Sequence, residues 1–226
     1  MRREIEPELR NGISGLKDDF TELILKYTEA AGISLSDEQA ELCRRHIQLM
    51  LEWNCRLNLT RITDPDEIAV KHLLDSLLPA HILPRSGPAL DIGTGAGFPG
   101  IPLKIAFPHL LVILIEVNNK KRAFLEHVIK KLGLTDVIIY SYDWRTFLRS
   151  TNYAIDYFFA RASLQPDELA RVFKPSCAYQ KAGLVYWASQ QWQPGKQEKP
   201  FIEKDISYDI EPGLKRRYIF FRKNVG

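Results

Sequence analysis

The first part of the chain carries apolar residues at helical spacing. From Leu16, hydrophobic side chains recur at 16, 20, 23, 24, 27 and 31, and Gly32 follows them. This spacing predicts an amphipathic helix that ends at the glycine. Residues 36–39, Ser-Asp-Glu-Gln, have the form of a capping box and predict a second helix through about Cys55.

The start signal occurs again at residues 64–67, Asp-Pro-Asp-Glu, with proline at the first helical position. A third helix should therefore run to about Leu78. We predict a flexible arm over 1–15, a helical N-terminal cap over 16–84 and a second domain over 85–226.

After Pro88 the periodicity changes, and short apolar runs alternate with helical stretches. Strands are predicted at Ala89–Ile92, Leu111–Glu116, Val137–Tyr140, Ile155–Phe159, Leu184–Trp187, Ile206–Tyr208 and Tyr218–Phe221, with helices near 100–107, 118–132 and 166–173. Alternating strands and helices indicate an α/β fold, with a parallel sheet covered by helices on both faces. The last two strands have no helix between them, which predicts an antiparallel edge strand. The polar stretch 189–200 is expected to be a mobile loop.

Glycines follow the first predicted strand. Residues 91–100 read Asp-Ile-Gly-Thr-Gly-Ala-Gly-Phe-Pro-Gly, and glycines there allow a tight turn and close approach of the backbone to a ligand. The second strand ends in Glu116, where an acid can bind both hydroxyls of a ribose. Strand, glycines, helix and acid at this spacing predict a nucleotide site.

The identity of the nucleotide depends on Asp91. Gly95, Gly97 and Gly100 also satisfy the dinucleotide pattern GxGxxG, so NAD must be considered. A carboxylate directly before the glycines would repel a pyrophosphate, whereas it would favour a cationic ligand such as S-adenosylmethionine. The sequence therefore favours S-adenosylmethionine as the cofactor.

Three segments together carry a family resemblance. DIGTGAGFPGIPLKI, preceded by NLTRITDPDEIAVKHLLDSLL and followed by IEVNNKKRAFLEHVIKKLGL, resembles the RsmG family, also called glucose-inhibited division protein B or GidB. The similarity runs from about Ser34 to Phe173 and continues more weakly to Lys223. It implies a class I methyltransferase fold (Rossmann-like, three-layer α/β/α, seven-stranded) with a helical cap. It also implies S-adenosylmethionine as methyl donor and guanine N7 of 16S rRNA in the small ribosomal subunit as acceptor. The start of the chain, which has no apolar segment, separately predicts a cytoplasmic protein.

The resemblance also implies roles for individual residues. The residues expected at the cofactor are Asp91, Gly93, Gly95, Gly97, Phe98, Glu116, Trp144, Arg145 and Arg161. Arg161 is also the residue expected to position the target base, with an ion pair to Asp156 or Asp143 as the structural alternative. Asn58, His72, Asp75 and Ser76 match the polar face that the cap presents to the pocket, although anchoring of the cap explains His72 and Asp75 equally well.

The chain departs from the family pattern at three places. Asp143-Trp144-Arg145 stands where the family has Arg-Ala-Glu, Trp187 replaces a lysine, and Glu116 replaces an aspartate. These changes keep two alternatives open: a class I methyltransferase with a different acceptor, and a non-catalytic RNA- or ribosome-binding relative.

Charge and composition add limits to this interpretation. The 226 residues carry a net charge of +3, which divides into −3 over residues 1–60 and +6 over 61–226. The basic body favours a polyanionic partner, although ordinary solvated lysines explain it equally well. The three cysteines and five histidines form no metal-binding motif, and the start MRREIEPELR has no apolar segment typical of a secretion signal. We expect no metal, no membrane span and a monomer.

If guanine N7 is the acceptor, it already carries an in-plane lone pair, and methyl transfer requires alignment without deprotonation. His72, Asp75 and Ser76 lie a turn apart on one predicted helix and are not expected to form a hydrolytic relay. Three basic clusters, at 120–122, 130–131 and 215–217, could follow an RNA backbone. The four tryptophans offer stacking platforms, with Trp53 expected in the core.

Overall fold

The computed structural model describes residues 18–81, 87–211 and 213–222. The predicted arm over 1–15 lies outside these ranges, and the proposed division into cap and second domain stays a prediction. No helix of the described residues is long and apolar enough to cross a membrane.

The N-terminal helices form where the capping signals predicted them. They are α2 (Asp18–Ala30), α3 (Asp37–Leu57), α4 (Pro65–Ile68), the π-helical segment η1 (Ala69–Leu74), α5 (Asp75–Leu77) and the 3₁₀ turn η2 (Leu78–His81). Ser36 and Gln39 form the predicted capping box at the start of α3, and the Asp64 side chain caps α4. The third predicted helix is therefore continuous, but its geometry changes between α, π and 3₁₀ along its length. The π-helical segment was not predicted, and such segments are often found at functional sites.

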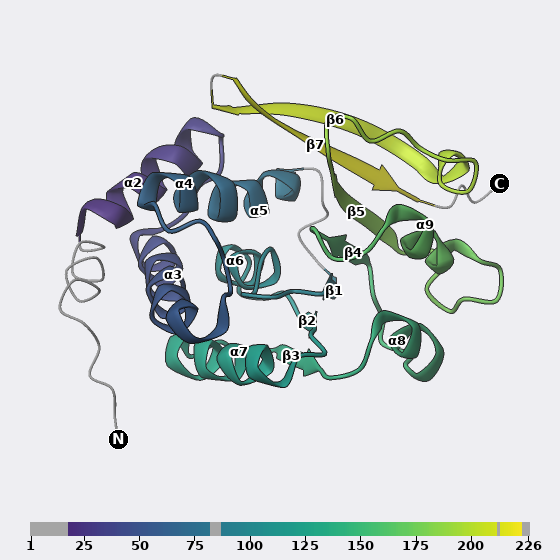
Figure 1. Ribbon diagram of the computed structural model, residues 1–226, viewed down its shortest axis with the longest axis horizontal. Coiled ribbons are helices and arrows are strands. Elements are labelled where there is room, and N and C mark those ends of the chain that lie inside the picture. Colours follow the sequence, from purple (N-terminus) through teal and green to yellow (C-terminus); the bar gives the residue numbers. More distant parts are fainter. Residues whose placement is uncertain (1–17, 82–86, 212, 223–226) are drawn as a thin grey trace.

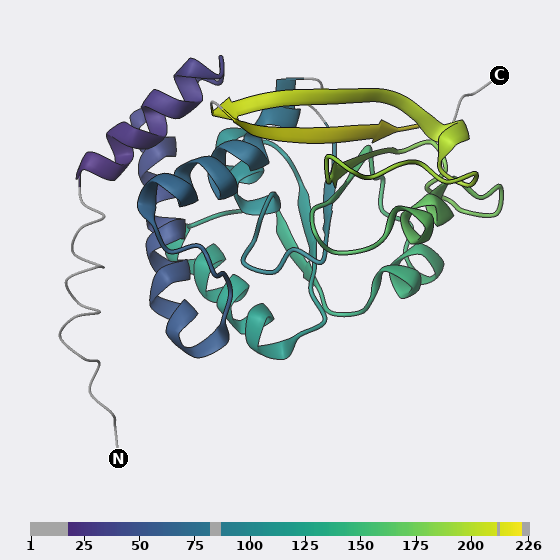
Figure 2. The same ribbon diagram turned by 45° about the horizontal axis from the view of Figure 1, so that its top comes forward.

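Seven strands form one sheet, in the order β3-β2-β1-β4-β5-β7-β6. They are β1 (Ala89–Ile92), β2 (Val112–Ile115), β3 (Val137–Tyr140), β4 (Tyr157–Ala160), β5 (Gly183–Ala188), β6 (Ile202–Glu211) and β7 (Leu214–Phe221). The first five are parallel, whereas β7 pairs antiparallel with both β5 and β6. The predicted antiparallel edge is confirmed, and it is a long hairpin. In both ribbon views this hairpin extends from the sheet toward α2 and α5 (Figures 1 and 2).

Helices cover both faces of the sheet, as the alternation predicted. The connecting helices are α6 (Gly100–Ala106), α7 (Asn119–Leu132), α8 (Trp144–Ser150), α9 (Pro166–Leu169) with the 3₁₀ turn η3 (Ala170–Phe173), and the 3₁₀ turn η4 (Lys199–Phe201). Side chains alternate along β1 and β2, so Ala89 and Val112 belong to one hydrophobic core and Leu90 and Ile113 to the other. Helix α3 packs on α6 and α7. The N-terminal helices therefore cover, from outside, the layer that these two helices form on the sheet (Figure 1).

Local predictions differ from the structure at one helix and at the last two strands, β6 and β7, which were predicted too short. Helix α8 was missed because its seven residues are too few to show a helical stripe, although Asp143 caps it through the Thr146 N–H. The segment 189–200 is a loop up to the start of η4, and its mobility stays a prediction. The Trp192 ring packs edge-on against Phe221, and the Arg217 guanidinium donates to the Trp192 carbonyl at 2.6 Å.

Candidate active site

The glycine loop after β1 is held together by a buried carboxylate. Asp91 is 1% exposed, and its Oδ2 accepts hydrogen bonds from the Thr94 hydroxyl at 2.6 Å and from the Gly100 N–H at 2.9 Å. Burial raises the pKa of Asp91 to about 6. Within the described chain, the Asp91 Oδ1 is buried without a hydrogen-bond partner. One oxygen therefore ties the loop, and the other is left with its acceptor capacity unused.

The backbone of this loop needs glycine. Gly93, Gly95 and Gly97 have φ values of 67°, 59° and 91°, which side chains with a Cβ adopt at a cost. A Cβ at Gly100 would lie 2.4 Å from a Leu114 methyl carbon, so that glycine serves packing of α6 on the sheet. A Cβ at Gly95 would meet only the Gly93 carbonyl oxygen, at 4.0 Å. The space at Gly95 is therefore open.

Glu116 joins the end of β2 to the same loop. Its Oε2 accepts from the Gly95 N–H at 3.2 Å and its Oε1 from the Asn118 N–H at 2.8 Å, with 6% of the residue exposed. Parallel strands bring their carboxyl ends to one edge of the sheet, which is where open α/β folds bind ligands. The structure thus places Glu116 and the glycines side by side, at the open space by Gly95.

Arg161, directly after β4, reaches the cap. It is 15% exposed and donates to Asp75 Oδ2 at 3.2 Å, and its Nη2 lies 2.8 Å from His72 Nδ1. Since Arg161 always donates, the His72 ring must accept at Nδ1. Burial, followed by the charge of Arg161, lowers the pKa of His72 to about 3, so this histidine is neutral near pH 7. The alternative partners named from the sequence, Asp156 and Asp143, were wrong, because the ion pair is made with Asp75.

Asp75 is the centre of the contact between cap and sheet. Its Oδ1 accepts from the Tyr218 hydroxyl at 2.8 Å and lies 3.5 Å from Arg216 Nε, while the Trp187 indole N–H donates to the Asp75 carbonyl at 3.1 Å. Burial raises the pKa of Asp75, and the charge of Arg161 opposes that rise. Ser76 follows Asp75 and is fully buried; its hydroxyl donates to the His72 carbonyl at 2.5 Å and accepts from Arg161 Nη1 at 3.4 Å.

These bonds exclude a hydrolytic relay. The Ser76 hydroxyl bonds to backbone, and the second ring nitrogen of His72 lies 2.8 Å from the Thr60 hydroxyl. Neither Ser76 nor Asp75 is hydrogen-bonded to the His72 ring. The anchoring interpretation of His72 and Asp75 fits this geometry.

Phe98 packs against two rings of the cap. Its centroid is 4.8 Å from that of His46 and 5.0 Å from that of His72, and the Arg161 guanidinium carbon is 5.6 Å from it. Phe98 is 6% exposed. The loop residue expected at the cofactor is therefore in contact with two histidines of the cap.

Three of the predicted site residues lie outside the cluster formed by Phe98, Arg161, His72 and Asp75. Trp144 is 3% exposed and packs edge-on against Phe158 in the second core. Arg145 is 59% exposed and forms a bidentate pair with Glu168, at 2.8 Å from both oxygens. Asp143 and Arg145 thus have separate partners: Asp143 caps α8 at the Thr146 N–H, and Arg145 pairs with Glu168. Asn58 is exposed and ends α3 in the left-handed conformation, with φ 48°.

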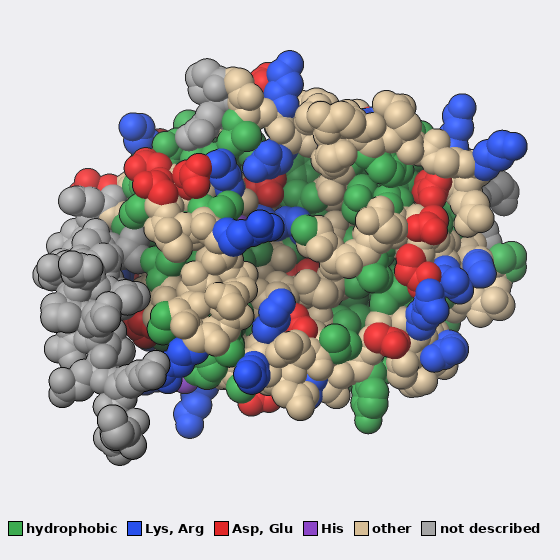
Figure 3. All heavy atoms as spheres, viewed as in Figure 1, with side chains coloured by type: hydrophobic (Ala, Val, Ile, Leu, Met, Phe, Trp, Pro, Cys, Tyr) green, Lys and Arg blue, Asp and Glu red, His purple; other side chains and the backbone are tan. Residues whose placement is uncertain are grey.

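The basic clusters are partly engaged. Arg122 folds back to the Val117 carbonyl at 2.7 Å, and Arg217 pairs with Asp205 at 2.6 Å, whereas Lys120, Lys130 and Lys215 are exposed. Figure 3 shows Lys and Arg side chains spread over the middle of the face seen in Figure 1, with acidic ones among them. The four tryptophans pack against the protein: Trp144 is buried and the other three are half-buried, which weakens their interpretation as stacking platforms. Trp53 packs on Phe124 and His127.

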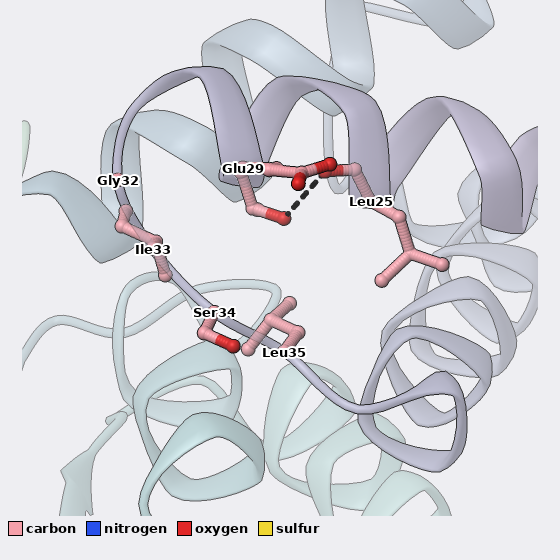
Figure 4. A pocket seen from close by; sticks show the side chains of 7 residues that line it. Leu25, Glu29, Gly32, Ile33, Ser34 and Leu35 are labelled. Atoms are coloured by element: carbon pink, nitrogen blue, oxygen red, sulfur yellow. Dashed lines mark hydrogen bonds between the residues drawn. The ribbon is translucent and has the colours of Figure 1, made fainter.

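Sequence reasoning missed His46, Thr60 and Tyr218. His46 and Tyr218 occupy apolar positions of a helix and a strand, and no local pattern shows that they face the site. Thr60, in Asn-Leu-Thr, lay inside a segment that carried the family resemblance. A separate hollow of about 460 Å³ is lined by residues of α2 and of the loop after it, with none from the glycine loop (Figure 4).

Comparison with known proteins decides the family. The family model described as rRNA small subunit methyltransferase G (GidB) matches residues 39–205. The chain belongs to this family. It is 52% identical over 113 residues to a ribosomal RNA small subunit methyltransferase G 1 of Syntrophobacter fumaroxidans, covering 50% of this chain and 51% of that protein. It is 41% identical over 151 residues to a ribosomal RNA small subunit methyltransferase G of Geobacillus thermodenitrificans, covering 65% and 63%.

The matched segments thus span between about half and two thirds of these relatives. Among solved structures, a SAM-dependent methyltransferase from Aquifex aeolicus superposes with a TM-score of 0.53 at 17% identity, covering 73% of this chain and 96% of that one. This likeness, together with the strand order of the sheet, confirms the predicted class I methyltransferase fold. Within the described residues, no group of three or more His, Cys, Asp or Glu could hold a metal ion.

Proposed function

We propose that the protein transfers a methyl group from S-adenosylmethionine to guanine N7 of 16S rRNA, in the cytoplasmic small ribosomal subunit. The observation that carries this proposal is the junction of the glycine loop with Glu116 and Asp91, in a chain that belongs to the RsmG family. The named relatives are methyltransferases of small-subunit ribosomal RNA.

The residues present fit this cofactor. The space at Gly95 is open, and the buried Asp91 Oδ1 has an unused acceptor position within the described chain. We propose that Gly93, Gly95 and Gly97 hold the methionine side and that Glu116 accepts the ribose hydroxyls. The Asp91 carboxylate would attract the cationic end of the molecule.

The remaining cofactor contacts follow from the same edge of the sheet. We assign the adenine to the backbone at Trp144 and Arg145, since their side chains are occupied in the second core and with Glu168. Phe98 and Arg161 border the cofactor from the cap side.

Bound S-adenosylmethionine supplies an electrophilic methyl group on its sulfonium. The chain has to align guanine N7 with that methyl group and exclude water, since N7 already carries the attacking electron pair. Arg161 is the proposed target-positioning residue, because a guanidinium can donate to guanine O6 or to a phosphate. Asp75 and His72 fix its direction. The neutral His72 ring is not needed as a base.

We propose that the acceptor RNA contacts exposed lysines such as Lys120, Lys130 and Lys215, that Asn58 lies at the cap side of the pocket, and that the buried Ser76 helps to shape it. We propose that the protein acts as a monomer without a metal. Trp187 keeps one alternative open, since its indole contacts Asp75 where the family has a lysine, and this could change the acceptor.

The test is methyl transfer to a defined substrate. The protein is incubated with tritiated S-adenosylmethionine and small ribosomal subunits from a strain that lacks the RsmG activity. Label in 16S rRNA supports the proposal. Cofactor binding without label in rRNA would indicate a different acceptor, and absence of both would indicate a binding module without activity.

A further inference from the structure

One histidine of the cap reaches into the glycine loop. His46 of α3 is 0% exposed, and its Nε2 lies 2.8 Å from the carbonyl oxygen of Ala96. A carbonyl only accepts, so the His46 ring carries its proton on Nε2. The other nitrogen, Nδ1, is buried and has no hydrogen-bond partner among the described residues. Burying a polar atom without a partner costs stability, so packing alone does not account for a histidine at this position.

The bond holds the carbonyl end of a peptide whose N–H is held from within the loop, since the Gly97 N–H donates to the Thr94 carbonyl at 2.9 Å. Ala96 lies between Gly95 and Gly97, both in the left-handed region, and glycine peptides rotate more freely than others. Other N–H groups of the loop donate to side chains of the strand ends, that of Gly95 to Glu116 and that of Gly100 to Asp91. The Ala96 carbonyl is held from the cap.

The His46 ring also packs on Phe98, and His72 stacks on the same phenyl ring. Burial lowers the pKa of His46 to about 4, so the ring is neutral near pH 7. A neutral ring can hold the loop without adding a positive charge that would repel a cationic ligand.

We propose that His46 is a positioning residue for the cofactor: its hydrogen bond fixes the Ala96–Gly97 peptide and so sets the shape of the surface that the glycine loop presents to the ligand. This rests on the proposed function, because the ligand is taken to be S-adenosylmethionine. The cap would then contribute to cofactor affinity without touching the cofactor.

The test compares variants by calorimetric titration with S-adenosylhomocysteine, the demethylated product. His46→Phe keeps a ring against Phe98 and removes the hydrogen bond, and it should raise Kd about five- to tenfold. His46→Gln offers an amide N–H at a similar reach and should return Kd to within about threefold of the wild type. Ile24→Ala opens a cavity in the buried face of α2; it should lower the urea midpoint without changing Kd.

A second measurement uses the wild type alone. The ¹⁵N shifts of the His46 ring should show a proton on Nε2 at pH 7. At saturating S-adenosylmethionine, kcat of His46→Phe should stay within about twofold of the wild type, so that the loss appears in KM.

Other outcomes separate the two proposals. An unchanged Kd in His46→Phe, an equal loss in His46→Gln, or a proton on Nδ1 would overturn the role of His46 while the wild type still binds. A wild type that does not bind S-adenosylhomocysteine would overturn the proposed function itself, and the role of His46 with it.

Discussion

Asp91 and Gly100 are joined across the whole glycine loop by a 2.9 Å hydrogen bond from the Gly100 N–H to the Asp91 carboxylate. The strand before the loop and the helix after it are thereby fixed to each other, with the ligand-facing glycines between them. This arrangement buries the Asp91 carboxylate. Its pKa is raised because burial stabilises the protonated form relative to the ionised form. A residue whose pKa is strongly shifted by its surroundings is a candidate for a functional role.

The first prediction concerns the stability of Asp91→Asn. Because the Asp91 pKa is raised from 3.8 to about 6 in the folded state, the folded protein binds more protons than the unfolded one between these values. Its contribution to the unfolding free energy is therefore largest at low pH and falls as pH rises through about 6. Asn does not titrate, so the Asp91→Asn variant lacks this loss of stability. The unfolding free energy of the variant, relative to that of the wild type, should therefore rise by about 1.5 kcal/mol between pH 5 and 7.5. Urea unfolding at both pH values measures it; a difference that does not depend on pH would refute the raised pKa.

The same substitution should weaken cofactor binding. A cationic ligand favours the ionised Asp91, so the affinity of the wild type for S-adenosylmethionine should fall as pH drops from 7.5 to 5. Asp91→Asn should bind weakly at all pH values in this range and show no such slope. Calorimetry at three pH values tests this, and equal slopes in both proteins would mean that another group controls binding.

The second prediction concerns the buried pair of Arg161 and Asp75. The side chains are 15% and 6% exposed, and removing one partner leaves the other charge buried without compensation. Asp75→Asn should lower the unfolding free energy by about 3–5 kcal/mol and reduce kcat/KM, since Arg161 loses its direction. The control is Asp205→Asn on the hairpin, which removes an acid that is 41% exposed from its pair with the less exposed Arg217 and should cost less than about 1 kcal/mol, because water screens the charge of Asp205. Equal losses in the two variants would show that Asp75 is not the anchor described here.

The third prediction concerns the charge swap at 143–145. Arg145 is largely exposed and bound to Glu168, so Arg145→Gln should leave both the unfolding midpoint and kcat/KM for rRNA close to those of the wild type. Arg161→Gln, measured in parallel, should reduce kcat/KM by at least tenfold while the labelled site stays the same. A large loss of activity in Arg145→Gln would place that side chain on the RNA and revive the idea of a changed acceptor contact.

Local patterns predicted much of this fold. The limits of β1 and β3 agree with the predicted strands, because each is a short apolar run bounded by polar or turn residues. Strand β6 was predicted too short, since its outer positions alternate with charged residues and resemble a loop. The glycine loop and Glu116 could be predicted because their chemistry is contiguous with strands. Asp75 with Tyr218, and His46 with Ala96, could not: these partners are 143 and 50 positions apart, and only the packed fold brings them together.

The most direct test of the central claim is the chemical identity of the methylated nucleoside. Small subunits from a strain lacking the RsmG activity are treated with the protein and S-adenosylmethionine, and the 16S rRNA is digested to nucleosides for mass spectrometry. The account predicts one 7-methylguanosine per 16S rRNA, formed by the wild type and strongly reduced with Arg161→Gln. Methylation of another atom or another nucleoside, or no new methylation by a protein that binds the cofactor, would contradict it.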